Sequence, residues 1–299
     1  ILRPDDAGRF DYSQVTVDDV VIIPAFGVSI QDFQYLRDLG CVLVDTTCGS
    51  VLNVWKRVEQ YAREGFTALV HGKYFHEETK ATASQVKKYA DGKYLIVRNM
   101  EQTEEICRVI EEGSGVEELA VKFREKASEG FDFVRDLERI GIANQTTMLA
   151  SESLAIADRV GQAMIRRYGE ATVEGHFRSF DTICSATQER QDAVLELVEE
   201  PLDMMIVIGG YNSSNTNHLA KICSRKRRTY HIADASCIDS DSGAIRFKPV
   251  GEDDERSDLG WLNESVHLIG ITAGASTPNN KIGEAIERIV HLRGLELPL

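Results

Sequence analysis

The sequence has 299 residues, of which 42% are hydrophobic and 27% are charged, and this composition is sufficient for a large core divided among two or three domains. The formal net charge of −14 argues against nucleic acid or an anionic membrane as the main partner, because both repel a strongly acidic chain. No apolar run approaches the roughly 20 residues that a membrane-spanning helix needs. We therefore expect a globular protein that acts on neither nucleic acid nor membrane.

Short apolar segments alternate with amphipathic helical segments along the chain. The expected strands are residues 20–26, 42–45, 67–70, 94–97, 140–143, 204–208, 230–233 and 267–271. Strands that alternate with helices are typical of βαβ units and parallel sheets, so the predicted class is α/β. Residues 113–133 interrupt the alternation, and their charge and glycine content predict a mostly helical excursion on the surface.

One strand–turn–helix unit occurs twice. Cys48 ends the turn Asp45-Thr-Thr-Cys48, and Cys184 ends the similar turn Asp181-Thr-Ile-Cys184. An amphipathic helical pattern follows each cysteine. Turns at the carboxyl ends of strands are where open α/β folds bind ligands. Two thiols in equivalent turns therefore predict a shared centre.

The six cysteines are widely and irregularly spaced, which argues against a disulfide scaffold. For any single cysteine, a buried and inert thiol is the default interpretation. Two thiols cannot fill a four-coordinate metal site, and an iron–sulfur cluster held by three cysteines needs one more. The other cysteines lie inside predicted strands or helices or in a loop, and they are Cys41, Cys107, Cys223 and Cys237. On this interpretation the missing ligand lies before Ile1.

Polar side chains follow other predicted strands, and because the carboxyl ends of parallel strands share one edge, they are expected to converge. These residues are His76, Glu78, Thr146, Thr147, Ser213, Ser214, Asn215 and Ser276. Glu78 is a candidate proton donor and His76 a candidate donor to an anion, whereas the hydroxyl and glycine turns suit a phosphate or diphosphate. The alternatives are a surface His–Glu pair and ordinary helix N-caps. A zinc site fits this pattern less well, because no second histidine or cysteine stands at the spacing of ligands on a helix.

Seven ordered motifs from about Val20 to the end resemble the 4-hydroxy-3-methylbut-2-enyl diphosphate reductases, the last enzymes of the methylerythritol phosphate route to isoprenoids. The motifs lie at residues 24–27, 44–48, 71–79, 143–148, 182–191, 210–216 and 272–278. The long form of several motifs and the insertion at residues 113–133 are similar to the plant and cyanobacterial branch.

The resemblance implies three α/β modules with parallel sheets, arranged as a trefoil around a central [4Fe–4S] cluster. Residues 1–47 would be the remainder of an incomplete first module, and residues 48–183 a second module with a helical insertion near 113–133. Residues 184–299 would form the third module, with a carboxyl-terminal strand and helix. Each module gives one cysteine in this family, and Cys48 and Cys184 match two of the three ligands.

The resemblance also implies roles for the other residues. An open iron would bind the substrate hydroxyl as a Lewis acid, Glu78 would deliver protons, and Thr146 would orient the hydroxyl. The diphosphate contacts would come from His76, Ser213, Ser214, Asn215 and Ser276. The implied products are isopentenyl and dimethylallyl diphosphate, and the electron donor would be a ferredoxin- or flavodoxin-like protein. The location would be the plastid stroma or a bacterial cytoplasm.

Two departures from the family pattern affect the expected activity. The family's first cysteine, in an early Gly-Phe-Cys turn, and a histidine in a following His-Asn-Pro motif have no counterpart in this sequence. Phe26 also stands where many bacterial members have a histidine. We therefore expect either a truncated sequence or a chain that is inactive alone. The alternatives are a non-catalytic anion-binding protein and a degenerate relative that binds diphosphates but lacks a complete cluster and activity.

Overall fold

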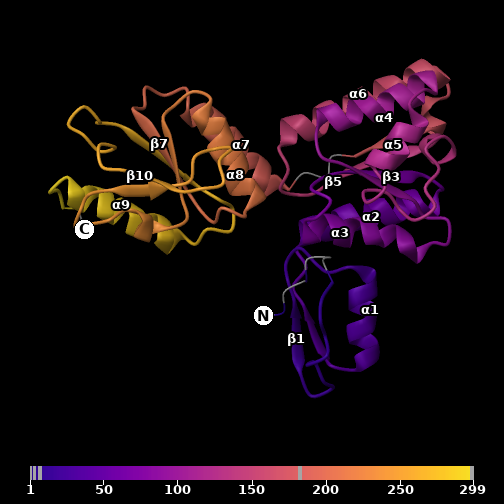
Figure 1. The fold of residues 1–299 in the computed structure, drawn as a ribbon, viewed down its shortest axis with the longest axis horizontal. Coiled ribbons are helices and arrows are strands. Elements are labelled where there is room, and N and C mark those ends of the chain that lie inside the picture. The colour runs from indigo at the N-terminus through magenta and orange to yellow at the C-terminus, as the bar shows by residue number, and fades with distance from the viewer. Residues whose placement is uncertain (1, 3–4, 6–8, 181–183, 297–299) are drawn as a thin grey trace. The chain divides into compact units, whose positions relative to one another are not determined.

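A computed structural model describes residues 2, 5, 9–180 and 184–296. The chain divides into two compact units, residues 1–183 and residues 184–299. Each unit is built from parallel strands joined by helices, in indigo to rose in the first unit and orange to yellow in the second (Figure 1). The predicted α/β class with parallel sheets is therefore confirmed.

The first unit begins with a small parallel sheet of two strands. Strand β1 (Val20–Ile23) pairs with β2 (Val42–Asp45), and helix α1 (Ile30–Leu39) connects them. The helix begins after Ser29, whose side chain accepts a hydrogen bond from the Asp32 N–H, and ends at Gly40 with a left-handed φ of 83°. Both ends of α1 are thus set by local capping.

The main sheet of the first unit has the strand order β4-β3-β5-β6, with all pairs parallel. Its strands are β3 (Thr67–His71), β4 (Tyr94–Val97), β5 (Ile140–Asn144) and β6 (Phe177–Ser179). Every residue of β3 and β5 is buried, as expected for parallel strands covered on both faces.

Helices cover both faces of this sheet. One core cluster joins it to α2 (Gly49–Arg63), α3 (Glu77–Ser84) and the short helix η1 (Gln85–Lys88). The opposite cluster joins it to α4 (Met100–Glu112) and α6 (Ala150–Tyr168). The remaining short helices of the unit are η2 (Arg135–Leu137) and η3 (Val173–Gly175).

Residues 113–133 lie largely on the surface as predicted, but they contain less helix than expected and bury three apolar side chains. Helix is confined to α5 (Val116–Lys122), and the apolar side chains of Leu119, Phe123 and Phe133 are buried in the core with α4 and α6. These three residues are spaced among charged ones, so their sequence pattern does not indicate burial. These three side chains attach the segment to the core, whereas its other residues are exposed or partly exposed.

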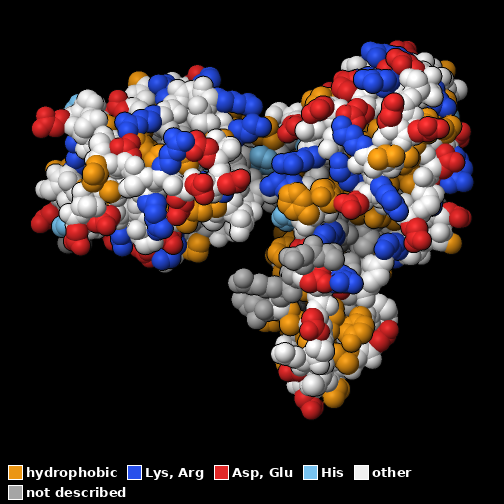
Figure 2. All heavy atoms as spheres, in the orientation of Figure 1, with side chains coloured by type: hydrophobic (Ala, Val, Ile, Leu, Met, Phe, Trp, Pro, Cys, Tyr) orange, Lys and Arg blue, Asp and Glu red, His pale blue; other side chains and the backbone are white. Residues whose placement is uncertain are grey.

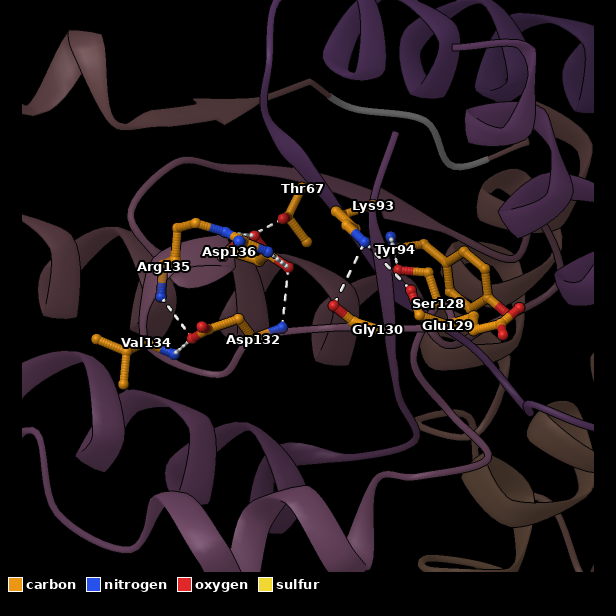
Figure 3. Close-up of polar contacts among 10 residues, drawn as sticks. All are labelled: Thr67, Lys93, Tyr94, Ser128, Glu129, Gly130, Asp132, Val134, Arg135 and Asp136. Carbon is orange, nitrogen blue, oxygen red and sulfur yellow. Dashed lines mark hydrogen bonds and ion pairs between the residues drawn. The ribbon is translucent and has the colours of Figure 1, made fainter. Parts of the chain in front are cut away.

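The end of this segment lies against the β4 edge of the sheet. The Ile96 N–H donates to the Lys126 carbonyl at 2.8 Å, and the Ser128 N–H donates to the Tyr94 carbonyl at 3.0 Å. Figure 3 shows Lys93 reaching the carbonyl groups of Glu129 and Gly130. These bonds give the edge strand a partner and fix residues 126–130 next to β4.

The second unit contains a parallel sheet with the order β11-β7-β8. Its elements are α7 (Ser185–Leu197), β7 (Met204–Ile208), α8 (Ser214–Ser224), β8 (Thr229–Ile232), η4 (Ala235–Cys237), β11 (Ile269–Ala273) and α9 (Asn279–Leu292). The acidic stretch at residues 239–258 carries a hairpin of β9 (Ile245–Phe247) and β10 (Arg256–Asp258). None of the described helices in either unit combines the length and apolar content needed to cross a bilayer.

A close backbone approach in the first unit yields a stability prediction. A Cβ atom on Gly141 would lie 2.5 Å from the ring of Tyr61, whose hydroxyl donates to the Ile142 carbonyl at 2.9 Å. We expect Gly141→Ala to lower the free energy of unfolding by about 1–3 kcal/mol, measured by urea denaturation. Gly49→Ala is the control, since a Cβ there meets nothing within 4 Å. Equal stability of the two variants would contradict the prediction.

Candidate active site

The turn between β3 and α3 carries His76 at the N-cap of the helix. The Nδ1 atom of His76 accepts a hydrogen bond from the Glu78 N–H at 3.2 Å, so the neutral ring carries its proton on Nε2. Burial, with the nearby charges of Lys73 and Lys80, lowers the pKa of His76 to about 4. His76 is therefore neutral at pH 7 and presents an Nε2–H donor.

Glu78 is a buried carboxyl group, with a side chain only 3% exposed. Its Oε1 atom accepts a hydrogen bond from the Thr146 N–H at 2.5 Å, which joins α3 to the turn after β5. Burial raises the pKa of Glu78, and the hydrogen bonds from Thr146 offset part of this effect. A carboxyl group of this kind can hold a proton nearer neutral pH than an exposed glutamate, as a general acid must.

Gln145 links these turns, and it was absent from the predicted site. Its fully buried side chain accepts from the Lys73 N–H at 3.2 Å and from the Thr79 hydroxyl at 3.1 Å. Its Nε2 atom donates to the Thr147 hydroxyl at 2.8 Å. Gln145 stands in the Asn-Gln-Thr-Thr motif, but its role as a connector depends on contacts with residues 66 and 72 positions away.

The turn that bears Cys48 adjoins His76 through one segment. Cys48 is exposed at the N-cap of α2, and its N–H donates to the Ala25 carbonyl at 2.8 Å. Phe26, which follows Ala25 in the sequence, packs its ring edge-on against the ring of His76, with 6.3 Å between the ring centroids. The first unit therefore brings Cys48, His76, Glu78 and Thr146 to neighbouring turns, as the sequence predicted for strand ends.

Cys184 occupies the matching position in the second unit, at the N-cap of α7, where it is partly buried. Asp181, Thr182 and Ile183, the rest of the predicted repeat of the Cys48 turn, lie outside the described residues. Helix N-termini stabilise negatively charged groups, which suits both cysteines as thiolate ligands. Within residues 2, 5, 9–180 and 184–296, no three His, Cys, Asp or Glu side chains gather closely enough to hold a metal ion. Each unit by itself supplies one candidate thiol.

The turns after β7 and β11 lie side by side in the second unit. Their strands are neighbours, and the Gly274 N–H donates to the Ile208 carbonyl at 3.0 Å. Ser213 is the N-cap of α8 and accepts from the Thr216 N–H at 3.3 Å, whereas Ser276 is exposed in the turn before α9. The predicted groups at residues 213–215 and 276 therefore belong to adjoining turns.

Asn215 has an unusual environment in this pair of turns. Its side chain is 3% exposed, and neither Nδ2 nor Oδ1 has a hydrogen-bond partner among the described residues. A buried polar group without a partner costs about 1–3 kcal/mol. An amide held in this way at the start of a helix suits a ligand that supplies the missing hydrogen bonds.

Asn217 holds the β7–α8 turn and gives a prediction on ligand affinity. Its Nδ2 atom donates to the carbonyls of Tyr211 and Ser213 at 2.7 and 2.8 Å. We expect Asn217→Ala to weaken the binding of inorganic pyrophosphate by roughly 5- to 10-fold, the loss of about one net hydrogen bond. Isothermal titration calorimetry measures this, with the exposed Asn53→Ala as control. Unchanged affinity in Asn217→Ala would show that the turn does not position the ligand.

The sequence profile of the LytB protein family matches residues 5–290. A protein of Rippkaea orientalis is 49% identical over 290 residues, covering 97% of this chain and 70% of the relative. One of Gloeothece citriformis is 47% identical over 284 residues, covering 95% and 69%. Both are named 4-hydroxy-3-methylbut-2-enyl diphosphate reductase.

Two solved structures are also similar. One is an (E)-4-hydroxy-3-methyl-but-2-enyl diphosphate reductase, described as the terminal enzyme of the non-mevalonate pathway. It matches with a TM-score of 0.51 and 27% identity over 91% of this chain and 76% of its own. The other, a reductase from Plasmodium falciparum, has a TM-score of 0.66 and 19% identity over 94% and 70%, so it supports the fold alone.

Proposed function

Because the chain belongs to the LytB family, we propose that it catalyses the reductive dehydroxylation of 4-hydroxy-3-methylbut-2-enyl diphosphate. The allylic C–O bond breaks, two electrons and two protons enter, and water leaves with isopentenyl or dimethylallyl diphosphate as product. The observation that carries this proposal is the buried Glu78 carboxyl, bonded to the Thr146 N–H in the turn that also holds His76.

In this proposal the chain holds a [4Fe–4S] cluster through Cys48 and Cys184. When bound, the cluster supplies the two electrons, one at a time. Both cysteines stand at helix N-caps, whereas the other four are buried, and burial raises the pKa of Cys107 and of Cys223 to about 12. Such thiols are poor thiolate ligands, so Cys48 and Cys184 are the cysteines of this sequence best suited to hold the cluster.

Glu78 is the proton donor in the proposed reaction. Its raised pKa keeps a proton available, and a second carboxyl oxygen stays near the reacting hydroxyl while Oε1 is held by Thr146. The Thr146 hydroxyl orients the substrate hydroxyl from the same turn. Together they deliver the proton that turns the departing group into water.

The diphosphate is bound by neutral donors in the proposed site. His76 offers its Nε2–H, and the start of α8 offers Ser213, Ser214 and the unpaired amide of Asn215. The exposed Ser276 adds a hydroxyl from the adjoining turn. Helix N-termini and hydroxyl-rich turns are suited to phosphate groups because their N–H dipoles point toward the anion.

Turnover of the substrate by anaerobically purified protein tests the proposal. The assay uses dithionite with a viologen mediator as electron source, and both five-carbon diphosphates are measured by mass spectrometry. Formation of both products, absent when dithionite is omitted, is the expected result. Protein that carries iron and sulfide yet forms no product would refute the proposed reaction.

A second candidate function is diphosphate binding without a complete cluster. It is favoured by one observation: only two of the six cysteines stand in strand–helix turns, and the other four are buried. Iron and acid-labile sulfide per chain separate the two candidates. Colourless protein that binds pyrophosphate and contains no iron after anaerobic reconstitution would favour this second function.

A further inference from the structure

Two large aromatic side chains are exposed beside the proposed site. Tyr74 and Phe75 are 37% and 52% exposed, and their rings pack edge-on at 5.4 Å between centroids. They directly precede His76 in the β3–α3 turn. Exposed aromatic groups of this size are typical of surfaces that contact another protein.

Three cations surround this aromatic pair. The Lys126 Nζ atom lies 5.9 Å from the ring centroid of Tyr74. Lys73 and Arg98 follow the neighbouring strands β3 and β4, which the Gly72 N–H joins by donating to the Val97 carbonyl at 2.9 Å. These positions place Lys73, Arg98 and Lys126 around one surface.

The three cations are not neutralised locally. Among the described residues, none of Lys73, Arg98 and Lys126 forms an ion pair. Burial together with the Arg98 charge lowers the pKa of Lys73, and burial with Lys122 and Arg98 nearby lowers that of Lys126. A neighbouring negative partner would relieve this repulsion.

Nearby acids oppose the cluster only in part. Glu77 pairs with Lys80, Glu105 with Lys122 and Asp5 with Arg9, whereas Asp32 and Glu125, which also line the hollow beside Tyr74 and Phe75, form no ion pair among the described residues. Elsewhere acidic and basic side chains are interspersed over the visible face of each unit (Figure 2). Among the described residues, the unpaired cations Lys73, Lys87, Arg98 and Lys126 outnumber the unpaired acids Asp32 and Glu125 around these aromatic rings, on a chain of net charge −14.

We propose that Lys73, Tyr74, Phe75, Arg98 and Lys126 form the docking surface for a small, acidic electron-carrier protein. This inference rests on the proposed function, because the reaction consumes two electrons that must arrive from outside the chain. A positively charged surface with an aromatic centre complements an acidic carrier protein. It also raises the association rate, which the negative charge on the rest of the chain would otherwise lower. The surface adjoins the turn that carries His76 and Glu78, so the carrier docks next to the reacting centre.

Direct binding tests the surface without relying on turnover. The probe is an acidic plant-type [2Fe–2S] ferredoxin, titrated into the full chain at low ionic strength by calorimetry. We expect Lys126→Glu to weaken binding at least tenfold and Phe75→Ser to weaken it severalfold. Lys221→Glu, an equal charge change at an exposed position of α8, should bind as the original does. Glu125→Gln, which removes an acid beside Lys126, should bind two- to threefold more tightly.

The outcomes separate this proposal from the proposed function. Wild-type affinity in Lys126→Glu, equal losses in Lys126→Glu and Lys221→Glu, or no ferredoxin binding at all would overturn the docking surface. If these substitutions instead abolish self-association measured by sedimentation, the occupant is a second copy and the assignment of an electron carrier is wrong. If Lys126→Glu keeps normal turnover with dithionite but loses turnover with reduced ferredoxin, both the docking surface and the proposed reaction are supported. If the original protein binds ferredoxin but shows no turnover with dithionite, the proposed docking surface stands and the proposed reaction is refuted.

Discussion

Glu78→Gln is expected to reduce turnover by about 10²- to 10⁴-fold, the usual contribution of a positioned general acid. Glutamine keeps the shape of the side chain and can still accept the hydrogen bond from the Thr146 N–H, so the fold is retained. It has no acidic proton to give to the departing hydroxyl. The loss should therefore appear in kcat, measured with dithionite as electron source, and leave the affinity for pyrophosphate unchanged.

The pH dependence of turnover gives an independent test of the same residue. Burial raises the pKa of Glu78 above its ordinary value of 4.5, so the protonated form persists to higher pH. A reaction that needs this proton slows as the pH rises through the raised pKa. We expect the residual turnover of Glu78→Gln to lack this alkaline decline.

Glu77→Gln is the matched control, because Glu77 is the preceding residue and pairs with Lys80 on the surface. Its turnover and pH dependence should equal those of the original protein. Full turnover in Glu78→Gln would show that the proton comes from another group. A loss of similar size in Glu77→Gln would instead point to a general disturbance of α3.

Cys184→Ser is expected to remove most of the bound iron and to lower turnover by more than about 10²-fold. A serine hydroxyl stays protonated at neutral pH, so it is a weak ligand for iron compared with a thiolate. The visible thiolate-to-iron absorbance of the reconstituted protein should fall with the iron content. Cys48→Ser should behave in the same way, because Cys48 occupies the same N-cap position in the first unit.

Cys41→Ser provides the control for the cysteine series. The Cys41 thiol is buried and donates to the Leu36 carbonyl at 3.4 Å, a bond that a serine hydroxyl can also make. This variant should keep the iron and sulfide content of the original protein. Retention of a complete cluster by Cys184→Ser would contradict the ligand assignment.

The sequence placed the thiols well because local patterns determine their positions. A short apolar strand precedes Cys48 and an amphipathic helix follows it, and this local pattern is enough to place the residue at the helix start. The environment of Glu78 could not be predicted in this way. Glu77 and Glu78 are adjacent and chemically identical, and only contact with Thr146, 68 residues later, buries one of them.

The structures of residues 113–133 and of the β9–β10 hairpin also could not be predicted from local sequence patterns. Phe123 and Phe133 are separated by charged residues, so no helical or alternating pattern marks them as core. The hairpin joins two strands of three residues across an acidic stretch, too short for hydrophobic periodicity. In both cases distant partners, the β4 edge and the strand β8 region, supply the stabilising contacts.

Gln145 has a consequence for how this protein can diverge. Its amide uses both ends, accepting from the backbone of Lys73 and the Thr79 hydroxyl and donating to the Thr147 hydroxyl. Replacement of Gln145 removes the acceptor shared by the Lys73 N–H and the buried Thr79 hydroxyl, and replacement of Thr147 removes the hydroxyl to which the Gln145 Nε2 atom donates. Positions 79, 145 and 147 should therefore change together among relatives, and an altered substrate range evolves more readily through the exposed turn at Ser276, where substitutions carry no such linkage.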